Sequence, residues 1–213
     1  MSVFIEPLIL YAVLFFRFLS GPMLPPESPP EFSASAEIAR LVLQTGPSLA
    51  LLWYMMLRAK GLAEWGVARP GVRDLIPALV SFAAIALVGF AVAAGFHRFG
   101  ASPGVPRIIV PGAVVPWAVL TLSVFAGAYL EESFFRLYLL SRLAEMGLGQ
   151  GRAVFVSTAM FALCHMHLGP WGILNAAVSG AVLACVFLRT RSLHGVGFAH
   201  GLYNVLVFAL GAA

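Results

Sequence analysis

Long apolar stretches alternate with short polar connections along the whole sequence. A run of about 20 apolar residues can cross the hydrocarbon core of a bilayer as an α-helix. Such runs occupy residues 7–23, 38–57, 75–96, 114–140, 153–168, 171–188 and 193–210. Short segments of alternating polarity, typical of membrane β-barrels, do not occur. Because a helix satisfies its own backbone in lipid, the pattern predicts an all-α polytopic bundle with about seven transmembrane helices, or about six to eight.

The composition supports a membrane location for the entire chain. Of its 213 residues, 61% are hydrophobic and only 10% are charged, and the mean hydropathy is +0.94. A soluble domain has about a quarter charged residues, so too few are present to cover a water-facing surface. We expect one integral membrane domain over 1–213, with N-terminal helices in 1–112 and the chemistry in 113–213. No basic cluster is interleaved with polar and aromatic residues, so no nucleic-acid partner is expected.

Basic residues gather in the connections on one side of the predicted bundle. These are Arg58, Lys60, Arg69, Arg73, Arg142, Arg152, Arg189 and Arg191. The positive-inside rule then predicts a cytoplasmic N-terminus and an outer C-terminus, in a prokaryotic cytoplasmic membrane. The first apolar run lacks a basic leading segment and a small-residue cleavage site, so we expect it to be retained rather than removed as a signal peptide. Cys164 and Cys185 lie in apolar runs and are expected to be buried free thiols.

Several polar residues lie deep within the last four apolar runs, where they are costly. Glu131, His165 and His200 are each nine to thirteen residues from an arginine at the predicted cytoplasmic end of their helix. At about 1.5 Å per residue, all three lie about 14–20 Å from that edge of a core about 30 Å thick. Three polar side chains on three helices thus share one layer near the midplane, which favours a functional site.

The two adjacent glutamates in this layer point in different directions around their helix. Glu132 and Arg136 are four residues apart and share a face, whereas Glu131 lies about 100° further round. Glu132 is therefore expected to pair with Arg136, while Glu131 is left facing elsewhere. Taken alone, a Glu–Arg pair is more often structural than catalytic.

Two further pairs have the same spacing of four residues. His200 and Asn204 are expected to point the same way, and Phe161 places a ring beside His165. Taken alone, each pair is also explained by packing, because intramembrane His and Asn side chains often form interhelical hydrogen bonds. Their coincidence with Glu131 at one depth favours a common site.

Three short motifs follow one another through this layer. They are Glu-Glu-x-x-x-Arg, Phe-x-x-x-His and His-x-x-x-Asn, formed here by Glu131, Glu132, Arg136, Phe161, His165, His200 and Asn204. In this order they resemble the CPBP family of intramembrane proteases, which includes the CaaX prenyl-protein endopeptidases. The stretch LRTRSLHGVGFAHGLYN, residues 188–204, also looks like the last motif of that family, with His194 where an aromatic residue often follows Ser-Leu. The resemblance covers about residues 114–208.

The resemblance implies an endopeptidase that hydrolyses a peptide bond within the membrane. It implies that Glu131 is the general base, that His165 is its partner on the attacking water, and that His200 and Asn204 stabilise the oxyanion. The implied supporting residues are Glu132, Arg136 and Phe161. No cofactor is implied by this mechanism. The substrate would be a membrane-associated peptide or protein, such as a tail, a leader or a lipidated segment, met in the lipid bilayer.

Other interpretations of the same residues stay open. Glu131, His165 and His200 would also suit the ligand set of a catalytic zinc, although the chain has no H-E-x-x-H. Asn204 is a poor zinc ligand and a good oxyanion donor, which favours the glutamic type. A non-catalytic immunity or scaffold protein would need none of these residues, and a small transporter with a proton path would need Glu131 without Asn204.

Overall fold

A computed structural model of the protein describes residues 5–20, 29–100 and 108–211. Its helices are α1 (Ile5–Ser20), α2 (Ala34–Arg40), α3 (Gly46–Ala59), α4 (Leu75–Arg98), α5 (Val114–Glu132), α6 (Leu140–Glu145), α7 (Gln150–Leu163), α8 (Gly169–Thr190) and α9 (Leu193–Gly211). Within the described ranges there is no strand, and a single isolated bridge joins Glu31 to Ile109. The predicted all-α class is confirmed.

Four helical stretches are long and apolar enough to cross a membrane. They are Val72–Arg98, Val114–Glu145, Met166–Thr190 and Leu193–Gly211, and Ile5–Phe16 is a shorter apolar helix. Each predicted apolar run overlaps a helix, which fits an integral membrane protein, and four helical stretches are candidate spans where the sequence predicts about seven. The last residues of the predicted first run, 21–23, lie outside the described ranges.

The predicted fifth run, 153–168, is wrong at its end. α7 stops at Leu163, and a 3-10 turn over Met166–Leu168 leads into α8. Gly169 has φ +71°, a left-handed conformation that suits glycine, and Pro170 then occupies the first turn of α8, where its missing N–H costs nothing. His165 therefore lies on a turn between two helices and not within a helix.

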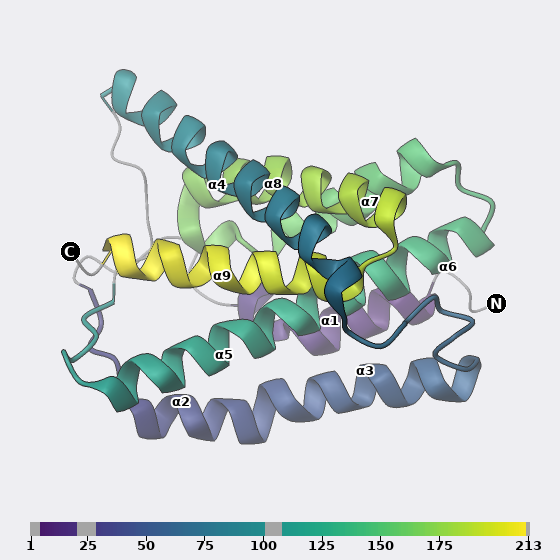
Figure 1. Ribbon diagram of the computed structural model, residues 1–213, viewed down its shortest axis with the longest axis horizontal. Coiled ribbons are helices and arrows are strands. Elements are labelled where there is room, and N and C mark those ends of the chain that lie inside the picture. Colours follow the sequence, from purple (N-terminus) through teal and green to yellow (C-terminus); the bar gives the residue numbers. More distant parts are fainter. Residues whose placement is uncertain (1–4, 21–28, 101–107, 212–213) are drawn as a thin grey trace.

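Two of the helical rods contain a π-helical turn. Leu41–Thr45 joins α2 to α3, and Ser133–Leu139 joins α5 to α6, so that each pair forms one continuous rod (Figure 1). Such turns disturb the regular backbone pattern and are frequent at functional sites. Phe135 lies in the second of these turns, and its carbonyl accepts a hydrogen bond of 2.9 Å from the buried hydroxyl of Ser157 on α7. This bond satisfies a backbone acceptor in the apolar interior.

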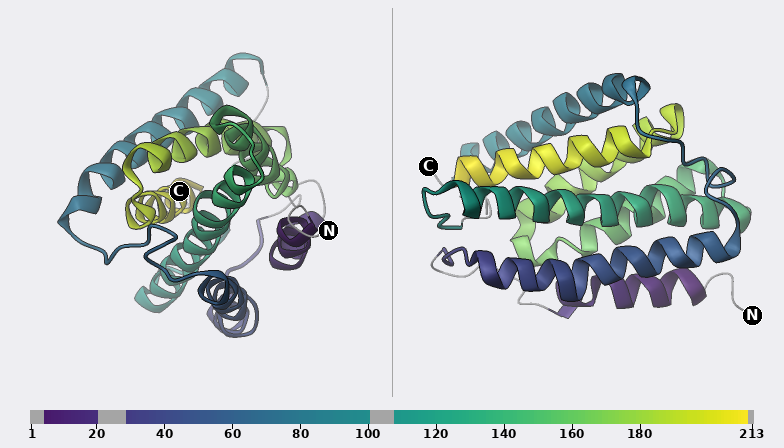
Figure 2. Two further views of the ribbon diagram at one scale, coloured as in Figure 1. Left: turned by 90° about the vertical axis from the view of Figure 1, so that its right-hand side faces the viewer. Right: turned by 60° about the horizontal axis from the view of Figure 1, so that its bottom comes forward.

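The rod formed by α5 and α6 runs through the middle of the bundle. α4, α8 and α9 lie on one side of it, and α1 with the α2–α3 rod lies on the other (Figures 1 and 2). Its π turn is buried throughout and packs Phe134 and Phe135 against Phe15 of α1 at ring separations of 5.3 and 5.0 Å. Aromatic pairs add about 0.5–1.5 kcal/mol beyond area burial, so this cluster helps to hold α1 on the second half of the chain.

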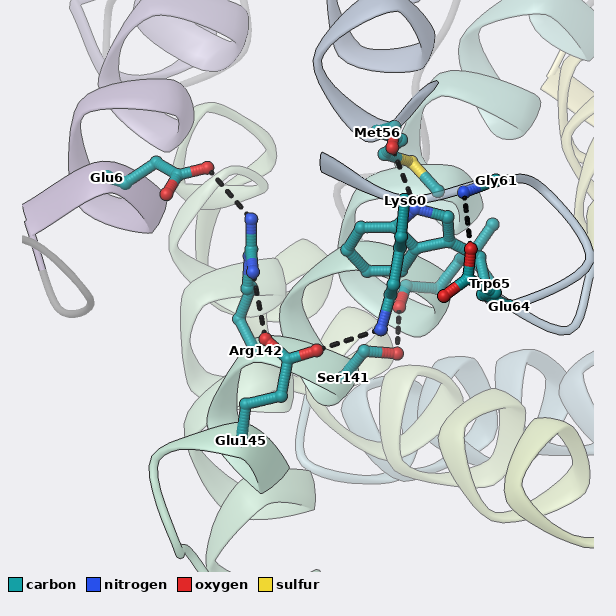
Figure 3. Close-up of polar contacts among 10 residues, drawn as sticks. Glu6, Met56, Lys60, Gly61, Glu64, Trp65, Ser141, Arg142 and Glu145 are labelled. Atoms are coloured by element: carbon teal, nitrogen blue, oxygen red, sulfur yellow. Dashed lines mark hydrogen bonds and ion pairs between the residues drawn. The ribbon is translucent and has the colours of Figure 1, made fainter. Parts of the chain in front are cut away.

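Charged side chains tie three helices together at one end of the bundle (Figure 3). Arg142 of α6 donates to Glu145 over 2.8 Å and to Glu6 of α1 over 3.3 Å, and Lys60 after α3 donates to Glu145 over 2.8 Å. Trp65 packs beneath Lys60 and donates its indole N–H to the carbonyl of Met56. Partly exposed ion pairs contribute at most about 1 kcal/mol each, so this network aligns the helix ends more than it stabilises the fold.

The two cysteines have different environments. Both are free, and Cys164 is buried as predicted, with its thiol 3.4 Å from the hydroxyl of Tyr11. Cys185 is exposed on the outer face of α8, so the prediction of a buried thiol is wrong there. An apolar run in a membrane helix includes lipid-facing positions, and helical periodicity alone did not distinguish them from buried ones.

Candidate active site

Glu131 and Glu132 occupy the end of α5, immediately before the π turn that carries Arg136. The predicted Glu132–Arg136 pair is present: Nε of Arg136 lies 3.0 Å from Oε2 of Glu132, and both side chains are fully buried. The contact is an ion pair without hydrogen-bond geometry, because neither of these two atoms has a hydrogen-bond partner among the described residues. Opposite charges in contact make burial of the two groups tolerable in the apolar interior.

Glu132 has a second partner, which the sequence did not indicate. Nδ1 of His200 on α9 donates to Oε1 of Glu132 over 2.9 Å. α9 approaches α5 closely because glycines face it: a Cβ at Gly201 would lie 2.6 Å from Cδ1 of Phe125. Small residues at a helix interface let two backbones come together in a membrane, and here they bring the imidazole within reach of the carboxylate.

His200 lies between the two adjacent carboxylates. Its Nε2 is 3.7 Å from Oε2 of Glu131, while its Nδ1 is held by Glu132. Glu131 is 14% exposed, and its Oε2 has no hydrogen-bond partner among the described residues. Since 3.7 Å is too long for a hydrogen bond, Glu131 keeps an uncommitted oxygen next to the imidazole.

His165 lies on the turn after α7, and a backbone contact fixes its orientation. Its Nδ1 is 2.8 Å from the carbonyl oxygen of Phe161. A carbonyl only accepts, so Nδ1 carries the proton and Nε2 of the neutral ring is an acceptor. The Phe161 ring packs against the imidazole with a centroid separation of 4.6 Å, as the spacing of four residues predicted.

Phe161 also connects the histidine to the buried ion pair. The guanidinium carbon of Arg136 lies 4.7 Å from the centroid of the Phe161 ring, which gives the cation an aromatic face. A Cβ at Gly180 of α8 would come within 2.9 Å of Cδ1 of Phe161. The ring therefore packs closely against both Arg136 and α8, and Phe161 positions Arg136 and His165 relative to each other.

All four predicted catalytic side chains line one cavity of about 500 Å³ inside the bundle. Glu131 comes from α5, His165 from the turn after α7, and His200 and Asn204 from successive turns of α9. Most other lining residues are apolar. The polar lining residues outside the predicted site are Arg40, Ser123, His167, Asn175, Ser179 and Tyr203. Asn175 and Ser179 share a helical spacing that gave a weak signal, whereas Arg40 looks like an ordinary charge at a helix end.

The residues of the alternative zinc set do not converge on a common point. Among the residues that the structure describes, no three His, Cys, Asp or Glu side chains are arranged so that they could hold a metal ion. Glu131, His165 and His200 share the cavity wall but do not form a ligand set as they stand.

These features define a polytopic membrane protein with carboxylate and imidazole side chains gathered on one cavity of its helical bundle. Residues 112–206 match the family model described as Rce1-like, type II CAAX prenyl endopeptidase Rce1-like. The match confirms the resemblance to the CPBP family, and its range includes every motif residue from Glu131 to Asn204. The family implies CAAX-type intramembrane endopeptidase activity, and hence a protease that acts on a peptide or protein in a lipid environment. No curated protein and no solved structure matches the chain.

Proposed function

We propose that the protein is an intramembrane endopeptidase of the glutamic type. Glu131 is the general base, His165 positions the attacking water, and His200 and Asn204 stabilise the oxyanion. One observation carries this proposal: Nε2 of His200 lies 3.7 Å from the uncommitted Oε2 of Glu131, while Glu132 holds the opposite ring nitrogen. Glu132 thus positions the imidazole of His200, whereas Glu131 keeps an oxygen that can accept a proton.

In the proposed reaction, Glu131 takes a proton from water as the water oxygen attacks the carbonyl carbon of the scissile bond. The resulting oxyanion accepts hydrogen bonds from a protonated Nε2 of His200 and from the side-chain amide of Asn204. Glu131 then gives its proton to the leaving amine as the C–N bond breaks, which regenerates the carboxylate. The products are a free carboxyl terminus and a free amine.

The contact between His165 and the Phe161 carbonyl supports the role of His165. Because Nδ1–H donates to that carbonyl, Nε2 of the neutral ring can accept a hydrogen bond from the attacking water. A second acceptor beside Glu131 would turn a lone pair of the water toward the substrate. Glu132 and Arg136 do not line the cavity and so do not contact the substrate in this proposal. Glu132 fixes the His200 ring, and Arg136 pairs with Glu132.

We propose that the substrate is a membrane-associated peptide with a lipidated cysteine close to its C-terminus. The support is the matched family together with the largely apolar wall of the cavity, which suits a segment already partitioned into lipid. Peptide leaders and unlipidated tails are the competing classes.

The test uses the full chain, purified and reconstituted in lipid nanodiscs. The probe is an internally quenched, S-farnesylated peptide that ends in Cys-Val-Ile-Ala, with products identified by mass spectrometry. We expect cleavage by the wild type and none by Glu131→Gln, because the amide keeps the size of the side chain but does not accept the proton of water at neutral pH.

A proteomic comparison of membranes from cells with wild-type protein or Glu131→Ala extends the test to natural substrates, and an uncleaved tail or leader should accumulate in the variant. If Glu131→Gln and His200→Ala both process substrates as the wild type does, the enzyme proposal is wrong. A scaffold would then account for the polar residues as packing devices.

A further inference from the structure

A guanidinium from the N-terminal half of the chain lies on the wall of the same cavity. Arg40 is the last residue of α2, and it lines the cavity together with Ser123 and Glu131 of α5. Its Nε donates to Oε2 of Glu37 over 2.9 Å, and its Nη2 contacts both Oε1 of Glu37 and the hydroxyl of Ser123. Nη1 makes no hydrogen bond to the described residues, and the side chain is 25% exposed. A cation inside a membrane cavity points to function.

The position of Arg40 relative to Glu131 follows from the regular part of α5. Ser123, Gly127 and Glu131 are spaced four residues apart, share one side of the helix and all line the cavity. Eight residues at about 1.5 Å each separate Ser123 from Glu131 by about 12 Å along the axis. A Cβ at Gly127 would meet nothing within 4 Å, so open space lies between the two polar positions.

An extended peptide fits this spacing. A peptide in that conformation rises about 3.3 Å per residue, so 12 Å corresponds to between three and four residues. If its scissile bond lies at Glu131, as the proposed function requires, a group about three to four residues away reaches the level of Ser123 and Arg40. The guanidinium would meet that group on the side of Glu131 that points away from Arg142, since Ser123 precedes Glu131 along the α5–α6 rod and Arg142 follows it.

We propose that Arg40 binds a carboxylate of the substrate about three to four residues from the scissile bond, and so selects peptides with an anionic group there. The carboxylate comes either from the C-terminus of a short tail or from an Asp or Glu side chain. Arginine suits this role because its guanidinium stays charged and Nη1 still has two N–H groups that can donate to a carboxylate. Ser123 and Glu37 anchor the opposite edge of the fork.

Glu37 has a predictable influence on this selection. Its carboxylate already contacts the guanidinium and would compete with, and repel, an incoming carboxylate. Removal of the charge at Glu37 should therefore strengthen the preference for an anionic substrate, whereas removal of the charge at Arg40 should abolish it. Two neighbouring variants with opposite expected effects separate a specificity role from a general loss of packing.

The experiment measures binding and not cleavage, so that a failure of Glu131 as base leaves its outcome unaffected. Full-length protein with Glu131→Gln is reconstituted in phosphatidylcholine nanodiscs. The probe is a fluorescein-labelled, S-farnesylated octapeptide ending in Cys-Val-Ile-Ala, prepared as the free acid, as the carboxamide, and as a carboxamide whose last residue is Glu. Fluorescence anisotropy gives the Kd of each peptide.

We expect the free acid to bind about tenfold more tightly than the carboxamide, as for a charge-assisted hydrogen bond at a partly exposed site. Tight binding of the Glu-containing carboxamide would identify a side-chain carboxylate as a sufficient ligand, and weak binding would identify the C-terminus. Arg40→Gln should remove the preference, and Glu37→Gln should enlarge it. Arg152→Gln, at an exposed arginine on α7, is the matched control and should leave it unchanged.

Equal binding of all three peptides to the parent, or no binding of any of them, would overturn the proposal. So would a preference for the acid that persists in Arg40→Gln. If Arg40→Gln does not fold, the proposal rests on Glu37→Gln, where an unchanged or smaller preference for the acid would contradict it. Cleavage of the probe by the wild type, measured separately, decides the proposed function.

Discussion

Glu132 of α5 accepts a hydrogen bond from Nδ1 of His200 on α9 over 2.9 Å. The same carboxylate forms an ion pair with Arg136 of the π turn, and both members of that pair are fully buried. One buried carboxylate therefore fixes a turn of its own helix and an imidazole on another. Because a buried charge is tolerated only when it is paired, these three side chains form a single unit whose members cannot be removed independently.

Replacement of Arg136 by alanine should destabilise the protein as well as inactivate it. The change leaves Glu132 buried without its ion-pair partner, and loss of one member of such a pair costs about 3–5 kcal/mol. The free energy of unfolding in detergent, or the thermal midpoint with activity measured in parallel, checks this expectation. A loss of activity at unchanged stability would indicate that Arg136 acts directly on the substrate.

The double variant Glu132→Gln/Arg136→Met is the control for this prediction. It removes both charges at similar volume, and replacement of a buried ion pair by uncharged groups is often close to neutral for stability. Stability should therefore recover toward the wild-type value. Activity should stay low, since the amide at position 132 no longer places a negative charge against Nδ1 of His200.

Gly180→Ala should lower activity without unfolding the protein. The added Cβ would lie 2.9 Å from Cδ1 of Phe161, so the ring that separates Arg136 from His165 must move. A displacement of a catalytic group by about 1 Å can cost about 10²-fold in rate, and we expect a drop of about tenfold or more in kcat. Gly151→Ala, where an added Cβ meets nothing within 4 Å, is the control. Equal kcat values for the two variants would contradict the positioning role of Phe161.

Asn204→Ala should reduce the rate less than Glu131→Gln does. It removes one proposed oxyanion donor and leaves the base in place, and loss of one such donor typically costs about 10²–10³ in kcat. Binding of the substrate should change little, because the donor acts on charge that develops only in the transition state. An equal effect on KM and kcat, or a complete loss of activity, would point to a different role for Asn204.

Zinc analysis separates the two enzyme mechanisms. For the glutamic type, purified protein should contain no stoichiometric zinc, and strong chelators should leave the cleavage rate unchanged. Elemental analysis and a chelator titration with zinc add-back make the measurement. Zinc at one per chain that disappears in His165→Ala would favour the metal mechanism, with Glu131, His165 and His200 recast as ligands.

The membrane class could be predicted from the length of the apolar runs, and several local pairings could be predicted from helical spacing. Apolar runs of sufficient length can only be helices in lipid, and all of them overlap helices here. Residues four apart share a face in a helix, which is why the contact of Glu132 with Arg136 followed from spacing. His165 still contacts Phe161 although α7 ends at Leu163, because its Nδ1 donates to the Phe161 carbonyl. Orientation in the membrane and the division of the chain at residue 112 stay predictions.

Other features of the site depend on how separate helices pack, which spacing along one helix does not specify. The pairing of Glu132 with His200 bridges 68 positions and requires the close approach of α5 and α9 at glycines. Arg40 reaches the cavity because α2 packs beside α5, where Ser123 holds it across 83 positions. His165 leaves its helix because Gly169 and Pro170 begin the next one. The sequence by itself determined which residues are too polar for lipid, since that cost belongs to each side chain alone. Only the tertiary structure decided which of them meet, because a contact between helices depends on the shape of both surfaces at once.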